Sequence, residues 1–77
     1  MKILFFGRLG ETIGREIEVD LPAGGCTVAA LRARLAKDHR GLDAANVRAC
    51  IDRAIAAETA RILPGQEVAF VPPLSGG

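Results

Sequence analysis

The 77-residue sequence contains no tryptophan, no tyrosine and only three phenylalanines. Proteins that bind single-stranded nucleic acid stack bases on aromatic side chains, so this shortage argues against such a partner. Positive charge is not concentrated either, because ten Lys and Arg residues are interspersed with nine Asp and Glu residues, for a formal net charge of +1. The sequence therefore predicts no binding of nucleic acid, which requires a basic surface.

Cysteine and histidine are equally scarce. Cys26 and Cys50 are the only cysteines and His39 is the only histidine. No Cys-x-x-Cys pair occurs, so a zinc site would lack ligands, and we expect no metal and two reduced thiols. His39 lies in the polar segment KDHR, which is typical of a solvated helix end and disfavours a nucleophile–histidine pair.

Long apolar runs are also missing, since none approaches the roughly 20 residues of a membrane-spanning helix. The N-terminal segment MKILFFGRLG has a short apolar run, but Gly7 and Arg8 follow it where a signal peptide would have its cleavage site. We therefore expect a cytoplasmic protein without a membrane partner. The length fits one compact domain.

Apolar periodicity predicts two N-terminal strands. In KILFFG, Ile3 and Phe5 fall on one face and Leu4 and Phe6 on the other, which indicates an interior strand. The segment REIEVDL alternates between apolar and acidic residues, so it faces water on one side, and we expect the two strands to form a hairpin. Between them, GRLGETIGRE lacks the Walker pattern of a phosphate-binding loop and is interpreted as the hairpin connection.

A helix and further strands follow. Thr27 is a suitable N-cap for VAALRARLAKD, which is predicted to be an amphipathic helix. The segments VRACI and EVAFV are predicted strands, with a short strand inside DRAIAAETA and a type II turn at Pro64 and Gly65. The sequence thus predicts an α+β fold of order ββαβ(β)β, in which one main helix packs on one face of a mixed four- to five-stranded sheet.

The C-terminal segment AFVPPLSGG has an unusual composition for a chain end. Pro72 and Pro73 hold the backbone extended and cannot continue a sheet ladder, so the residues after them are carried away from the sheet. Gly76 and Gly77 have no Cβ and can enter a channel too narrow for side chains. We therefore consider the carboxylate of Gly77 a candidate functional group.

The segments ILFFGRLGE, TVAALRARLA, LPGQEVAFVPP and LSGG make the chain similar to the ubiquitin-like β-grasp sulfur carriers of the MoaD/ThiS family, and within it to the small subunit of molybdopterin synthase. This resemblance implies one ubiquitin-like β-grasp domain over residues 1–77 with an extended tail at 72–77. Two departures concern Val71, where many members have Phe, and Asp52, where many have Asn.

The resemblance also implies a function in molybdenum cofactor biosynthesis. An ATP-dependent enzyme would adenylate Gly77, and a sulfur-donating enzyme would convert it to a thiocarboxylate. The tail would then enter the active site of the large synthase subunit, where sulfur passes to a pyranopterin precursor. The chain itself would bind no cofactor and would not be an enzyme alone, because the catalytic side chains would belong to the large subunit.

Two groups of residues follow from the same resemblance. The tail that threads the partner's active site comprises Pro72, Pro73, Leu74, Ser75 and Gly76, and the expected contacts with the large subunit are Phe6, Phe70 and Val71. Three alternatives share parts of this pattern: a sulfur carrier of the thiamine pathway, a ubiquitin-like modifier whose C-terminus forms isopeptide bonds with lysines, and an interaction domain with an inert tail.

Overall fold

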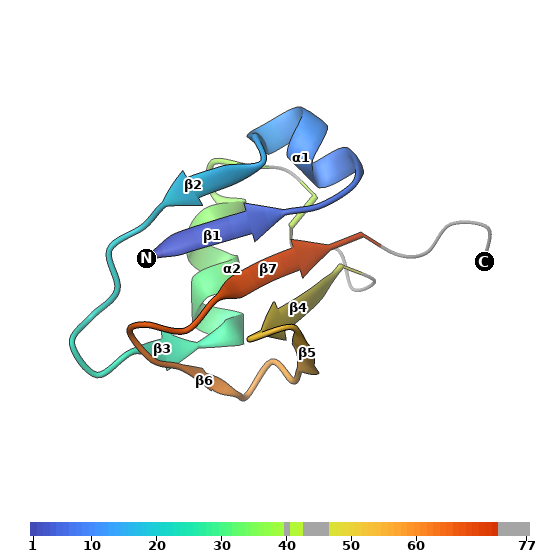
Figure 1. Ribbon diagram of the computed structural model, residues 1–77. Coiled ribbons are helices and arrows are strands. Elements are labelled where there is room, and N and C mark those ends of the chain that lie inside the picture. Colours follow the sequence, from blue (N-terminus) through green and yellow to red (C-terminus); the bar gives the residue numbers. More distant parts are fainter. Residues whose placement is uncertain (40, 43–46, 73–77) are drawn as a thin grey trace.

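The computed structural model describes residues 1–39, 41–42 and 47–72 (Figure 1). A mixed five-stranded sheet has the strand order β2-β1-β7-β4-β5, and a second sheet pairs β3 with β6. Helix α2 lies behind the larger sheet in the view of Figure 1. The elements are β1 (Lys2–Phe5), α1 (Arg8–Ile13), β2 (Glu16–Glu18), β3 (Cys26–Thr27), α2 (Val28–Ala36), β4 (Arg48–Ile51), β5 (Ala54–Ala56), β6 (Arg61–Ile62) and β7 (Val68–Val71).

The last strand of the chain occupies the centre of the larger sheet. Strand β7 runs parallel to β1, with Phe5 opposite Phe70, and antiparallel to β4, with Ala49 opposite Phe70. The predicted pairing of the two N-terminal strands is confirmed, because β1 is antiparallel to β2 with Ile3 opposite Ile17. The mixed sheet with one long helix on one face is thus as predicted.

The core lies between this sheet and α2. From the sheet it takes Ile3, Phe5 and Phe70, whose side chains are buried. The rings of Phe5 and Phe70 stack with their centroids 5.9 Å apart. The helix contributes the predicted apolar stripe, all of it buried: Val28, Leu31 and Leu35.

The N-terminus of α2 has a partner for each of its first three backbone N–H groups. Thr27 is the N-cap, as predicted, and its Oγ1 accepts a hydrogen bond from Ala30 N at 3.1 Å. The N–H groups of Val28 and Ala29 donate to the carbonyl oxygens of Ala60 and Glu58 at 2.9 and 3.0 Å. These bonds satisfy donors that a helix leaves unpaired and tie α2 to the segment after β5.

The segment between β1 and β2 connects the two strands of a hairpin, as predicted, but it also contains a helix that the sequence pattern did not indicate. This helix is α1, whose Leu9 is buried and whose Ile13, four residues later, packs on the core. A Cβ at Gly10 would lie 2.9 Å from the carbonyl oxygen of Phe5, so the glycine lets the helix approach β1 closely. A helix of six residues containing a glycine gives too little periodicity to be recognised in the sequence.

Two turns shape the sheet. The turn at Pro64 and Gly65 is confirmed, since Gly65 has φ of 92° and Gln66 N donates to Leu63 O at 3.2 Å. Between β4 and β5, Asp52 and Arg53 both have positive φ, of 49° and 71°. Asp52 is fixed there by Glu67, whose N–H donates to Asp52 Oδ1 at 2.9 Å and whose carbonyl oxygen accepts from Asp52 N at 2.8 Å.

Candidate functional site

The C-terminal tail begins at the end of the central strand. Beyond the last β1–β7 register pair, the N–H of Phe6 still donates to the carbonyl oxygen of Phe70 at 3.1 Å. Val71 completes β7, and Pro72 follows as the last described residue of the tail. Because β7 is hydrogen-bonded on both sides, the point at which the tail starts is held firmly by the sheet.

Gly7 and Pro72 lie against each other at this point. A Cβ on Gly7 would come within 2.8 Å of Cγ of Pro72, closer than real Cβ contacts. Gly7 also has φ of 60° and ψ of −137°, a backbone conformation that side chains disfavour. The glycine therefore provides both the space and the backbone conformation that set where Pro72 lies. The two motifs singled out in the sequence, FFGRLGE and AFVPP, meet here.

The remaining tail residues of the sequence-based prediction are Pro73, Leu74, Ser75, Gly76 and Gly77, and they lie outside the described residues. The expected thiocarboxylate at Gly77 and the threading of the tail stay predictions.

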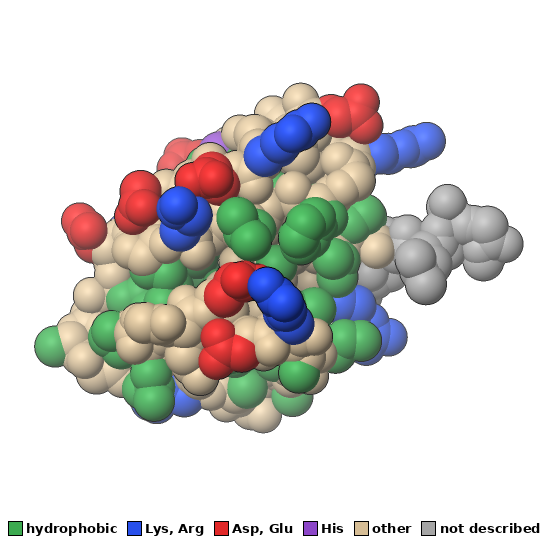
Figure 2. Space-filling view, viewed as in Figure 1, with side chains coloured by type: hydrophobic (Ala, Val, Ile, Leu, Met, Phe, Trp, Pro, Cys, Tyr) green, Lys and Arg blue, Asp and Glu red, His purple; other side chains and the backbone are tan. Residues whose placement is uncertain are grey.

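The sheet face opposite α2, which we call the open face, carries an apolar row across four strands. The strand registers place Leu4 opposite Ala69, Ala69 opposite Cys50, and Cys50 opposite Ile55. Ala69 on β7 and Cys50 on β4, the two central members of this row, have small side chains, so the surface of the open face is lowest over these strands. Figure 2 shows hydrophobic side chains on this face, with Lys, Arg, Asp and Glu side chains both around and between them.

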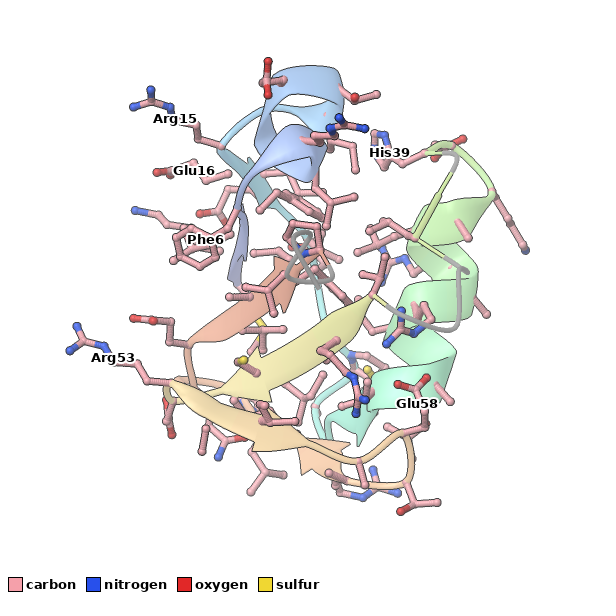
Figure 3. The ribbon with its side chains drawn as sticks, turned by 90° about the vertical axis from the view of Figure 1, so that its right-hand side faces the viewer. Phe6, Arg15, Glu16, His39, Arg53 and Glu58 are labelled. Atoms are coloured by element: carbon pink, nitrogen blue, oxygen red, sulfur yellow. The ribbon has the colours of Figure 1, made fainter. Side chains whose placement is uncertain are left out.

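The aromatic end of the open face is formed by Phe6 and Val71. The side chain of Phe6 is 49% exposed, and Val71, half-buried, lies opposite Arg48 in the neighbouring strand. Figure 3 shows Phe6, Arg15 and Glu16 projecting together from the side opposite α2. A groove of about 520 Å³ lies beside them and reaches Gly7, which lies against Pro72 at the start of the tail.

Phe70, predicted as a third contact, does not belong to this face. Its side chain is fully buried, with the ring stacked on Phe5 and with the guanidinium of Arg32 lying 5.4 Å from its centroid. Successive residues of a strand point to opposite faces, so Phe70 and Val71 cannot both be surface contacts on one side of the sheet. We therefore remove Phe70 from the candidate interface.

The structure adds Ile55 to the open face, a residue that the sequence analysis missed. Its side chain is 71% exposed on edge strand β5, where it extends the apolar row to the end of the sheet. The neighbouring alanines gave the segment no alternation of apolar and polar residues. The available signal in the sequence was a single large apolar residue, Ile55, between alanines in a predicted strand.

The residue types that serve as nucleophiles, bases and metal ligands are dispersed. Cys26 and Cys50 are free thiols on different sheets, and His39 follows α2. Within residues 1–39, 41–42 and 47–72, no group of three His, Cys, Asp or Glu side chains is arranged to hold a metal ion. None of the helices in these ranges has the length and apolar character needed to cross a membrane.

Comparisons with known proteins agree on the fold. The chain resembles the structure of SAMP1 from Haloferax volcanii, with 26% identity, a TM-score of 0.78, and coverage of 99% of this chain and 97% of the other. It also resembles the putative molybdopterin converting factor subunit 1 from Pyrococcus furiosus, with 23% identity, a TM-score of 0.79 and coverage of 95% of each chain. No curated protein matched the chain.

These likenesses confirm the expected ubiquitin-like β-grasp fold. The likeness to the Pyrococcus furiosus protein, at 23% identity, shows a shared fold and nothing further. A family model, in contrast, matches residues 3–77, which is nearly the whole sequence and includes the open face and the tail. The chain therefore belongs to the ThiS family.

Proposed function

We propose that this chain is a sulfur carrier and that it acts as the small subunit of a molybdopterin synthase. The position of β7 supports this role most directly. The central strand of the sheet leads without interruption into the tail, and the contact of Pro72 with Gly7 holds the start of that tail beside an apolar face. A partner that docks on the open face would thus receive the C-terminus in one orientation.

The chemistry proposed for Gly77 is the activation of a carboxylate. A carboxylate resists nucleophiles until one of its oxygens becomes part of a good leaving group. An activating enzyme would join the carboxylate to AMP with release of pyrophosphate from ATP. A donor enzyme would then supply sulfur at the sulfide level, whose attack on the carbonyl carbon forms a C–S bond and displaces AMP, which leaves a thiocarboxylate. The ATP would belong to the activating enzyme, and this chain would bind no cofactor.

The large synthase subunit is the proposed partner of the open face. Phe6 and Val71 lie nearest to the tail, and Leu4, Cys50 and Ile55 continue the apolar surface across the sheet. Aromatic side chains and a centre poor in charged residues are typical of protein interfaces. The side chains that catalyse sulfur transfer would come from the large subunit. All of these partners would operate in the cytoplasm.

A ubiquitin-like modifier is the second candidate, and the likeness to SAMP1 favours it, because that small archaeal modifier protein shares 26% of aligned residues over almost the full length. In this function the activated Gly77 would form an amide bond with lysines of other proteins. A sulfur carrier of the thiamine pathway would use the same activation with a different acceptor.

Intact mass spectrometry tests the proposal. The purified chain is incubated with its activating enzyme, ATP and a sulfur donor, then treated with a thiol-selective alkylating agent, beside a variant lacking Gly77. The variant is needed because sulfur for oxygen and oxidation of methionine or cysteine add nearly the same mass. An ATP-dependent alkylatable group that disappears with Gly77, followed by pyranopterin sulfuration on addition of the large subunit, is the expected result. Conjugates of higher mass without a thiocarboxylate would favour the modifier instead.

A further inference from the structure

The chain has few groups that could form a stable amide with its own activated C-terminus. An acyl-adenylate or thioester is attacked by amines, whereas arginine stays protonated in proteins and does not attack. Eight of the ten basic side chains are Arg, and only positions 2 and 37 are Lys. Together with the α-amino group of Met1, the sequence thus offers three amines.

The α-amino group of Met1 is engaged by the fold. It donates a hydrogen bond to the carbonyl oxygen of Val19 at 2.8 Å and lies 3.3 Å from the carboxylate of Glu18. The Met1 side chain is only 4% exposed, so this end of β1 is also covered by its surroundings. The amine must leave these partners before its nitrogen can attack an acyl group.

Lys2 lies on the open face. Its Nζ is 3.4 Å from the carboxylate of Glu16, in a surface ion pair whose side chains are 58% and 53% exposed, and the register places Lys2 opposite Glu18. The open face is also the surface that the proposed function assigns to the partner protein, so docking would cover this lysine.

Lys37 is placed differently. It directly follows the last residue of α2, and this helix lies on the side of the larger sheet opposite the open face. The buried stripe of α2 ends at Leu35, two residues earlier, so Lys37 falls about 200° around the helix from the core and is exposed. Within the part of the chain that the structure describes, no carboxylate forms an ion pair with it.

We propose that Lys37 is the site at which the activated C-terminus of one copy acylates a second copy. The lone pair of Lys37 Nζ attacks the carbonyl carbon of Gly77, a C–N bond forms, and the bond to the leaving group breaks. One proton passes from the nitrogen to solvent, and no atom is oxidised or reduced. The product is an amide that joins two chains. This site rests on the proposed activation of Gly77, and it would remain accessible when the open face is occupied.

The test uses a full-length chain that carries an aryl thioester at Gly77, installed chemically so that no activating enzyme is required. The folded protein is held at mildly alkaline pH, and the conjugates are digested with trypsin. Because the sequence contains no Lys or Arg after Arg61, acylation at Lys37 gives one branched peptide that joins residues 62–77 to residues 35–40. We expect this peptide to be the main product.

Matched variants separate the three amines. Lys37→Arg, which keeps the charge, should lose the conjugate, whereas Lys2→Arg should retain it. In concentrated urea the preference should disappear, because Met1 is released from Val19 and Glu18. Equal or greater acylation of Met1 or Lys2 in the folded protein, or an unchanged yield with Lys37→Arg, would overturn the proposal. Such a result would not bear on the enzymatic activation of Gly77, because the thioester here is installed chemically. The intact-mass assay described above tests that activation separately.

Discussion

Arg32 and Glu58 form a two-pronged ion pair between helix α2 and the segment that follows β5. Arg32 Nε donates to Glu58 Oε1 at 2.9 Å and Nη2 donates to Oε2 at 2.7 Å, while Nη1 reaches the carbonyl oxygen of Leu42 at 2.7 Å. The Arg32 side chain is only 11% exposed and that of Glu58 is 50% exposed. One guanidinium thus joins three parts of the chain above the ring of Phe70.

Replacing Arg32 by Lys should destabilise the fold although the charge is kept. An ammonium cannot reproduce the planar fork that serves Glu58 and Leu42 together, so we expect a loss of about 1–2 kcal/mol in the free energy of unfolding. Glu58→Gln should cost less, under about 1 kcal/mol, because Glu58 is half exposed and Arg32 keeps its other partners. Urea denaturation of both variants measures the two losses, and the opposite ranking would contradict this account of the pair.

The adjacent glycines 24 and 25 should respond in opposite ways to alanine. Gly25 has φ of 79°, and a Cβ there would overlap the carbonyl oxygen of Ile62 in the β3–β6 sheet. We expect Gly25→Ala to lower the free energy of unfolding by about 1–3 kcal/mol. Among the described residues, a Cβ at Gly24 meets nothing within 4 Å, so Gly24→Ala should be neutral or stabilising by up to about 1 kcal/mol. Thermal and urea unfolding compare them, and a similar effect at both positions would show that the close approach is unimportant.

Gly7→Ala should change how the C-terminus is presented. The variant strains a positive φ and pushes a methyl group toward Pro72, which should lower stability by about 1–3 kcal/mol and slow adenylation of Gly77. Gly41→Ala is the matched control, because Gly41 has φ of 96° but no residue that the structure describes lies within 4 Å of its Cβ position. Both variants should lose stability, and only Gly7→Ala should lower kcat/KM with the activating enzyme. Equal kcat/KM values for the two variants would show that the contact of Gly7 with Pro72 does not affect how the tail is presented.

Phe6→Asp should weaken binding of the large synthase subunit at least about tenfold, since buried aromatic anchors contribute most to interface affinity. Leu63→Asp controls for lost apolar surface, because Leu63 is 48% exposed, close to the 49% of Phe6, but lies in the turn before β7, at the end of that strand away from the tail. Isothermal calorimetry measures both affinities. Equal weakening by the two variants would place the interface away from Phe6.

Gly76→Val should abolish sulfur transfer while the unfolding curve stays unchanged. The proposed channel of the partner fits only glycine, so a branched side chain beside Gly77 would not enter it, and the substitution lies after the last described residue of the sheet. Single-turnover formation of the sulfurated pterin is the measurement, with Ser75→Ala as the control that alters the tail without widening it. Normal turnover by Gly76→Val would contradict the threading of the tail.

The main elements of the fold could be predicted from the sequence because their apolar residues repeat over several positions. Helix α2 has the buried stripe and the Thr27 cap that the pattern indicated, and β1, β4 and β7 follow the alternation. Strands β3 and β6 are two residues each, too short for any alternation. Their pairing depends on Gly25, whose contact with Ile62 joins positions far apart in the sequence.

The candidate site was predicted less completely. Phe6 was identified correctly as a side chain on the open face, because it alternates with the buried Phe5. The same reasoning applied to β7 would have rejected Phe70, which lies one residue from Val71 and points into the core. The contact of Gly7 with Pro72 could not be predicted, since it requires the parallel pairing of β1 and β7 across the length of the chain.

The same parallel pairing determines how the domain bears mechanical load. A partner that draws the tail into its active site, or releases it afterwards, pulls on β7 along the strand axis. Its hydrogen bonds to β1 and β4 lie across that axis, so they share the load together in shear and do not open one at a time. Under the proposed function, the globular part would therefore keep its shape while the C-terminus is inserted into a partner and withdrawn.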